Sequence, residues 1–326
     1  MSQVRIALIG CGTAAEYYHL PALRSLVDPA SVWFVDRDLR RAELLARQLG
    51  APRDHAATSW EPLDVEAAIV ATPNHLHAPI ASALLARGTH VLSEKPLANS
   101  RSEGAAVVDA VQGETILAVG HFRRFFPTTT LVADLITRRV CGEPRSFSAE
   151  EGYVFAWESQ SAEWLDPEKA GGGVLGDLGP HVFDLLRAWF GDLSVESYED
   201  DFLGGVEADA LVRLAGDVSG TVELSRTRTL RNTILIECSD GSIEAPLSSP
   251  GEIILEIEGK EHRVDVAAAD AYPDAFRAQL ADFLTAIEQR SPPTVGGAEG
   301  LAVLELIDDA YRMRRRLSQP WLTELA

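Results

Sequence analysis

Short apolar runs and helix-type segments alternate along the first 120 or so residues, and this alternation constrains the fold more than any other feature. The apolar runs predict strands at Val4–Ile9, Val32–Val35, Ala67–Ala71, His90–Leu92 and Ile116–Val119. Helical patterns lie between most of them, at Ala14–Leu26, Arg40–Leu49, Ile80–Arg87 and Ser102–Val111. Strands that alternate with helices form a parallel sheet covered on both faces, so we expect an α/β fold that begins with a doubly wound sheet.

Beyond about Arg123 strand-type runs follow one another with few helices between them. Examples are Ala210–Leu214, Ser219–Leu224, Thr233–Cys238, Ile253–Ile257 and His262–Val266, and the predicted helices are Pro180–Trp189, Pro273–Gln289 and Ala298–Leu317. Successive strands without crossover helices imply a mainly antiparallel sheet. A chain of 326 residues is large for one hydrophobic core, so we expect two domains, 1–122 and an α+β domain 123–326. The last helix, about 298–317, could pack back on the first domain.

The net charge limits which binding partners the chain can have, and the cysteines indicate its cellular compartment. A formal net charge of -20 leaves little basic surface, which argues against nucleic-acid and anionic-membrane binding. The one basic cluster, Arg312 to Arg316, is placed in the last predicted helix, where cations suit the dipole at a C-terminus. Three scattered cysteines fit a reducing compartment, and neither a leader nor a membrane-spanning run is evident, so we expect a cytoplasmic protein.

A glycine turn follows the first predicted strand and opens a helix. Its sequence is Gly10-Cys11-Gly12-Thr13-Ala14-Ala15, a GxGxxA string whose glycines let the backbone approach a pyrophosphate at the helix N-terminus. Alone the string could be an ordinary strand-to-helix turn. Asp36 ends the second strand, where an acid can bind adenosine ribose hydroxyls, and this favours NAD. Arg37 follows immediately and could accept a 2′-phosphate, so NADP remains possible.

The segment Ala71-Thr72-Pro73-Asn74-His75-Leu76-His77 leaves another predicted strand at its carboxyl end. Ligands of doubly wound sheets bind at that edge, so Thr72, Pro73, Asn74 and His77 are expected to reach the cofactor. A helix cap that faces solvent is the alternative. His75 and His77 could be a metal pair, but no acidic or cysteine ligand stands close in sequence, and we predict no metal.

Ser93-Glu94-Lys95-Pro96-Leu97 also ends a predicted strand at this edge. Glu94 and Lys95 are candidates for contact with the cofactor. A lysine beside a nicotinamide can donate a hydrogen bond to a substrate hydroxyl and stabilise the developing alkoxide. Considered by itself, Lys95 could equally be an exposed lysine that precedes a turn.

The glycine-rich run 171–179 leads to Pro180, His181 and Asp184. We expect Asp177 to cap a helix that Pro180 helps start, with His181 on the same face within the first turn. The positive helix end would keep His181 neutral and able to accept a proton, with Asp177 or Asp184 orienting the imidazole. A plain cap and a buried core histidine are the alternative interpretation.

Taken together, these segments resemble the Gfo/Idh/MocA oxidoreductase family over nearly the whole chain. The resemblance rests on GxGxxA, Asp36, Ala-Thr-Pro-Asn at 71–74, Glu-Lys-Pro at 94–96 and GGG…Asp-x-x-x-His at 171–181. It implies an N-terminal Rossmann domain and a C-terminal domain with an open, mostly antiparallel sheet. It also implies Lys95 and His181 as the reacting pair, Asp177 beside them, often a cis bond before Pro96, and dimers or tetramers.

One segment departs from the family pattern. Where relatives commonly have Asn or a similar polar residue between Gly120 and Phe125, this chain has Phe122, although Arg124 and Pro127 match. We include Arg124 among the substrate-binding residues with Asp177 and His181. Aromatic residues before the glycine run could form a wall for the face of a sugar, or could partly be core; they are Tyr153, Phe155, Trp157 and Trp164.

The function implied is reversible hydride transfer between NAD(P) and a secondary alcohol or ketone of a sugar, an inositol or a sugar derivative. Two alternatives remain. One is an NAD-dependent enzyme of the same fold that cleaves or eliminates a glycoside, and the other is a non-catalytic dinucleotide sensor.

Overall fold

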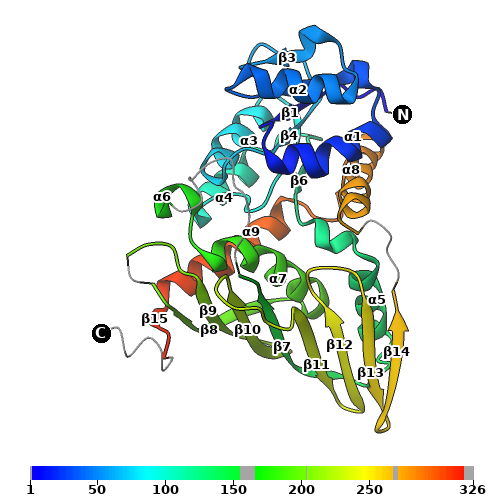
Figure 1. Ribbon diagram of the computed structural model, residues 1–326, viewed down its shortest axis with the longest axis vertical. Coiled ribbons are helices and arrows are strands. Elements are labelled where there is room, and N and C mark those ends of the chain that lie inside the picture. Colours follow the sequence, from blue (N-terminus) through cyan, green and yellow to red (C-terminus); the bar gives the residue numbers. More distant parts are fainter. Residues whose placement is uncertain (1, 155–165, 203, 267–270, 319–326) are drawn as a thin grey trace.

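The computed structural model describes residues 2–154, 166–202, 204–266 and 271–318. Two sheets lie one above the other in Figure 1, each with its own helices. Phe155, Trp157 and Trp164, predicted to belong to an aromatic wall, lie outside the described residues. In the part of the chain that the structure describes, no helix is long and apolar enough to cross a membrane.

The first sheet is parallel and doubly wound, as the alternation predicts. Its strand order is β3-β2-β1-β4-β5-β6. The strands are β1 (Ile6–Ile9), β2 (Val32–Val35), β3 (Ala56–Ala57), β4 (Ala67–Val70), β5 (His90–Ser93) and β6 (Leu117–Val119). The strand order reverses between β1 and β4, and the carboxyl ends of these strands border the crevice where such sheets bind ligands.

Helices cover both faces of this sheet. They are η1 (Ala15–His19, π-helical), α1 (Leu20–Leu26), η2 (Pro29–Ser31), α2 (Leu39–Leu49), η3 (Arg53–His55), η4 (Asn74–Leu76), α3 (His77–Leu85), α4 (Arg101–Asp109) and α8 (Ala271–Gln289). Leu8 and Phe34 share one apolar cluster with Phe283 of α8, although α8 comes late in the chain. Ala7 and Val70 pack on the other face with Leu84. The predicted division between residues 122 and 123 stays a prediction.

The second sheet has nine strands in the order β14-β13-β12-β11-β7-β10-β9-β8-β15. They are β7 (Pro144–Gly152), β8 (Leu193–Asp200), β9 (Asp209–Gly216), β10 (Ser219–Ser225), β11 (Thr233–Cys238), β12 (Gly241–Pro246), β13 (Glu252–Ile257), β14 (Lys260–Asp265) and β15 (Arg314–Arg316). Among the strands that the structure describes, only the pairs β7–β10 and β8–β15 of this sheet are parallel, so the predicted mostly antiparallel sheet is confirmed.

Alternate residues of the second sheet face its helices. Phe147, Val222 and Ile234 are buried there, in one cluster with Phe183 of helix α7. Helices α5 (Pro127–Thr137), α7 (Val174–Phe190) and α9 (Gly297–Arg312) pack against this sheet. Two short helices lie between the halves: η5 (Phe122–Phe125) contacts α5, α7 and α8, and α6 (Pro167–Ala170) contacts η4. Because side chains alternate along a strand, the opposite face carries mainly polar residues such as Ser148.

The last helix is shorter than predicted. α9 ends at Arg312, and Arg314–Arg316 form strand β15 beside β8, so the prediction of a helix to Leu317 was wrong. Arg314 lies 2.7 Å from the buried Asp200 carboxylate, an ion pair that draws this segment onto the sheet edge. α9 itself lies between the two halves: Leu304 packs with the first sheet, and Ile307 packs with the second.

Helix α7 begins earlier than predicted, at Val174, so Pro180 lies inside it and Asp177 is not its cap. The cap is supplied by Glu207, a residue from another part of the chain. Its Oε1 accepts hydrogen bonds from the backbone N–H of Gly173 at 2.9 Å and of Leu175 at 3.1 Å, and from the hydroxyl of Tyr311 at 2.7 Å. A buried carboxylate therefore fixes the start of the helix that carries Asp177 and His181.

Replacing Glu207 with Ala should lower the free energy of unfolding by about 3 kcal/mol, because three buried donors lose their acceptor. Glu207→Gln keeps an acceptor oxygen and should cost less than half as much. Urea unfolding followed by far-ultraviolet circular dichroism measures both. Equal stability of Glu207→Ala and the wild type would contradict this role.

Candidate active site

A cavity of about 840 Å³ lies at the carboxyl ends of β1, β2, β4 and β5 and extends to α7. All twelve residues predicted to bind the cofactor line it: Gly10, Gly12, Thr13, Ala14, Asp36, Arg37, Thr72, Pro73, Asn74, His77, Glu94 and Lys95. Asp177, His181 and Tyr153 line it as well. Residues far apart in sequence therefore share the walls of a single cavity.

The glycine turn has the shape that a dinucleotide requires. Gly10 has φ +94°, and a Cβ there would lie 2.4 Å from the carbonyl oxygen of Ala71 at the end of β4. A Cβ on Gly12 would meet no atom within 4 Å, so the space beside this backbone is open to the cavity. Open space beside the backbone at the start of a helix fits a pyrophosphate.

Asp36 holds the glycine turn from the end of β2. Its Oδ2 accepts a hydrogen bond from the backbone N–H of Cys11 at 2.9 Å, and its Oδ1 accepts one from the backbone N–H of Asp38 at 2.9 Å. The carboxylate therefore has a defined orientation at the cavity wall, where its remaining lone pairs can accept from ribose hydroxyls. Arg37 and Arg41 line the same end of the cavity.

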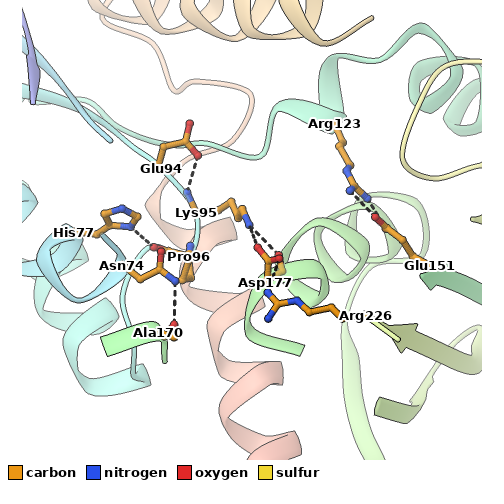
Figure 2. Close-up of polar contacts among 10 residues, drawn as sticks. All are labelled: Asn74, His77, Glu94, Lys95, Pro96, Arg123, Glu151, Ala170, Asp177 and Arg226. Carbon is orange, nitrogen blue, oxygen red and sulfur yellow. Dashed lines mark hydrogen bonds and ion pairs between the residues drawn. The ribbon is translucent and has the colours of Figure 1, made fainter. Parts of the chain in front are cut away.

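Two predicted cofactor residues also join neighbouring segments. The ring of buried His77 lies 2.7 Å from the carbonyl oxygen of Pro96 and 2.8 Å from that of Thr72, and only one ring nitrogen can donate when the ring is neutral. Asn74 Nδ2 donates to the carbonyl oxygen of Ala170 at 2.9 Å (Figure 2). Among the described residues there is no cluster of metal ligands that would include His75 and His77.

Glu94 and Lys95 occupy the end of β5. Glu94 Oε1 lies 2.8 Å from Nε2 of buried His19, and its Oε2 accepts from the backbone N–H of Lys95 at 3.2 Å. Burial raises the pKa of Glu94, but its hydrogen bond to His19 and the nearby charges, that of Lys95 among them, together bring this pKa below its usual range, so Glu94 stays ionised. The bond between Lys95 and Pro96 is cis, as the family resemblance implies.

The side chain of Lys95 crosses to helix α7 (Figure 2). Its Nζ donates to Asp177 Oδ1 at 2.9 Å and to the main-chain oxygen of Asp177 at 2.9 Å. Arg226 Nη2 lies 2.7 Å from the other carboxylate oxygen, Oδ2. Burial raises the pKa of Asp177, yet the charges of Lys95 and Arg226 bring it well below its usual range.

The expected roles of Asp177 and Asp184 toward His181 need correction. Asp177 lies between Lys95 and Arg226, and both oxygens of Asp184 accept from Arg124, at 2.6 and 2.9 Å. The imidazole Nδ1 of His181 is buried and has no hydrogen-bond partner among the residues that the structure describes. Neither carboxylate hydrogen-bonds to the ring in the part of the chain that the structure describes; each is directed at a cation instead.

His181 lies two turns into α7 rather than in its first turn. Its ring meets the edge of Phe122 at a centroid distance of 5.2 Å, and Phe122 stacks on Phe276 of α8 at 4.6 Å. Burial, followed by the charges of Arg123 and Lys95, brings the pKa of His181 well below 6.5. The imidazole is therefore neutral, as predicted, but burial and nearby cations are the cause rather than the helix end.

Sequence reasoning missed four charged residues of the cavity wall: Arg41, Arg123, Glu151 and Arg226. Arg123 and Glu151 form a buried ion pair with contacts of 2.6 and 2.8 Å (Figure 2). Arg123 stands next to Arg124, the residue that was predicted to bind substrate. Arg124 does not line this cavity, since its guanidinium is turned to Asp184. Trp157 and Trp164 lie outside the described residues.

Comparison with known proteins identifies the family. Residues 4–121 match the model described as an oxidoreductase family with an NAD-binding Rossmann fold, and residues 129–244 match the corresponding C-terminal domain model. The chain belongs to the Gfo/Idh/MocA oxidoreductase family. It is thus an oxidoreductase chain whose Rossmann domain is of the NAD-binding type.

Individual relatives agree with this membership. The chain is 29% identical to levoglucosan dehydrogenase of Pseudarthrobacter phenanthrenivorans, over 74% of this chain and 73% of the relative. It is 30% identical to trans-1,2-dihydrobenzene-1,2-diol dehydrogenase of Oryctolagus cuniculus, over 69% of this chain and 70% of the relative. A solved complex of levoglucosan dehydrogenase with NADH and levoglucosan has a TM-score of 0.84 at 23% identity, covering 95% of this chain and 96% of that one, and shows the shared fold.

The lowered pKa of His181 predicts a pH dependence of stability. In the unfolded chain His181 takes up a proton near pH 6.5, whereas the buried ring of the folded protein stays neutral. Protonation therefore stabilises the unfolded state as the pH falls from about 6.5 toward 5. The free energy of unfolding should therefore fall less steeply in His181→Asn than in the wild type, by up to about 1.4 kcal/mol per pH unit. Urea unfolding at pH 7.5, 6 and 5 measures the difference. Parallel curves for the two proteins would refute the assignment.

Proposed function

We propose that this chain oxidises a secondary alcohol of a neutral sugar, inositol or related polyol to the ketone, or reduces the ketone, with a nicotinamide dinucleotide. The observation that carries the proposal is one cavity whose wall joins the glycine turn and Asp36 at one end to Lys95, Asp177 and His181 at the other. Names of relatives support the substrate class, since levoglucosan dehydrogenase is similar along most of the chain.

The neutral imidazole of His181 is suited to take the proton of the substrate hydroxyl. Lys95 carries three N–H donors, of which two are directed at Asp177, so one remains to donate to the same substrate oxygen. Bound nicotinamide supplies the hydride acceptor in one direction and the donor in the other. Loss of the hydroxyl proton and of the hydride on the carbinol carbon converts the alcohol to a ketone. In the reverse direction the ketone gains both.

Charge pairing in the substrate half of the cavity supports an uncharged substrate. Arg123 is neutralised by Glu151, while Lys95 and Arg226 share Asp177. The carboxylate of Glu94 lies at the same wall and is held by His19. The cations at this end are therefore directed at protein carboxylates, and hydroxyl groups suit the remaining donors and acceptors better than a phosphate does.

Lys95→Ala and His181→Ala should each lower kcat/KM at least 100-fold, because each removes a group that contacts the reacting oxygen. NADH binding, measured by fluorescence quenching, should stay within a few-fold of the wild type. Normal turnover by either variant would exclude the assigned roles.

We propose NAD as the preferred cofactor, because the Asp36 carboxylate repels a 2′-phosphate. Asp36→Asn keeps an oxygen acceptor for the Cys11 N–H and removes the charge, and Arg37 lies close by. The ratio of kcat/KM for NADP to that for NAD should rise at least tenfold in this variant. Steady-state kinetics with both cofactors test this, and an unchanged ratio would count against Asp36 as the determinant.

The substrate class is tested by following NAD and NADP reduction at 340 nm across free sugars, inositols, sugar phosphates and nucleotide sugars. Reduction with neutral polyols supports the proposal. Cleavage of a glycoside without net NADH formation would instead support an eliminating enzyme of the same fold.

We also propose a cytoplasmic location and a homodimer or homotetramer. The three cysteines are unpaired thiols, which suits a reducing compartment. Helices α5, α7 and α9 pack against the second sheet (Figure 1). Its strands β7 and β10 alternate inward apolar with outward polar residues. The outward face is the surface we expect between subunits, and light scattering after size exclusion measures their number.

A further inference from the structure

Arg226 lies in the loop that follows β10, where its backbone N–H donates to the carbonyl oxygen of Ala208 at 2.8 Å. Its side chain is largely buried, with 9% of it exposed, and lines the cavity. Figure 2 shows its guanidinium beside the carboxylate of Asp177 that Lys95 also contacts. The two cations use different oxygens: Lys95 Nζ lies 2.9 Å from Oδ1, and Arg226 Nη2 lies 2.7 Å from Oδ2.

This arrangement determines which way the carboxylate faces. A carboxylate with one cation can turn both oxygens toward it, because bidentate contacts are favourable. Arg226 holds Oδ2, so Lys95 contacts only Oδ1 and the main-chain oxygen of Asp177. Two of the three ammonium donors are then fixed in direction, and the third is left for a ligand in the cavity.

The three residues come from three separate parts of the fold. Lys95 follows β5 of the parallel sheet, Asp177 lies on α7, and Arg226 follows β10 of the second sheet. The ion-pair chain therefore spans the cavity wall from one sheet to the other. Loss of Arg226 would leave Asp177 free to rotate and Lys95 free to follow it.

We propose that Arg226 is a positioning residue for hydride transfer, which fixes Asp177 so that one N–H of Lys95 stays available to the substrate oxygen. This inference rests on the proposed function. It assigns Arg226 a role through Asp177 rather than a contact with the reacting atoms.

Arg226→Met should lower kcat 10- to 100-fold, change KM for the polyol less than threefold and leave NADH binding unchanged. Arg226→Lys restores a cation and should recover at least a third of the lost kcat. The matched control is Arg228→Met in the same loop, because Arg228 pairs with Asp209 and Glu223 and does not line the cavity. Its kcat should stay within twofold of the wild type.

A double-mutant cycle with Asp177→Asn separates positioning from direct contact. If Arg226 acts through Asp177, then Arg226→Met should change kcat/KM less than twofold in the Asp177→Asn background. An equal loss in both backgrounds, or a normal kcat for Arg226→Met, would overturn the inference.

The same double-mutant cycle, applied to the urea unfolding midpoint of the apoprotein, measures the interaction between Arg226 and Asp177 without enzyme turnover. The shift in the double variant should be smaller than the sum of the two single shifts, and additive shifts would show that the two side chains do not interact. If the wild type oxidises no polyol, the proposed function fails and so does the kinetic role, while this cycle still shows whether Arg226 holds Asp177.

Discussion

The parallel course of β1, β2, β4 and β5 is the constraint on which the rest of the structure depends. Because all these strands end at one edge, Gly10, Asp36, Thr72 and Lys95 come to one cavity although they are far apart in sequence. The reversal of strand order beside β1 keeps helices from filling that edge. The second sheet then adds α7, so that Asp177 and His181 complete the opposite wall.

Paired charges give this cavity its chemical character. Carboxylates of Glu94, Glu151 and Asp177 each lie against a cation or a histidine, which offsets the cost of removing them from water. His181 has no such partner at Nδ1 among the described residues, and burial together with nearby cations keeps it neutral. The cavity thus brings the ammonium group of Lys95 and a neutral imidazole together, the two properties that the proposed alcohol oxidation requires.

Much of the site could be predicted because its signals are local. The glycine turn, Asp36 and Glu94-Lys95-Pro96 each follow an apolar strand, and a strand end in a parallel sheet has a predictable location. Arg226 and Glu151 carried no such signal. Arg226 follows β10 and Glu151 lies near the end of β7, and the neighbours of these strands in the sheet are set by long-range pairing. Arg124 was favoured over Arg123 on motif position, and the structure turns Arg124 toward Asp184.

By itself, the sequence determined the doubly wound domain, the mostly antiparallel second sheet and the motifs that gather at the carboxyl ends of the parallel strands, because periodicity and short motifs act over a few residues. Only the tertiary structure decided that Glu207 caps α7, that Arg314–Arg316 form a strand, and that Asp177 faces Lys95 and Arg226 instead of His181. Each of these depends on a buried charge meeting a partner more than 25 residues away. Such pairing is set by which distant segments the fold brings together, within the second sheet for Arg314 and Asp200 and between the two halves for Lys95 and Asp177.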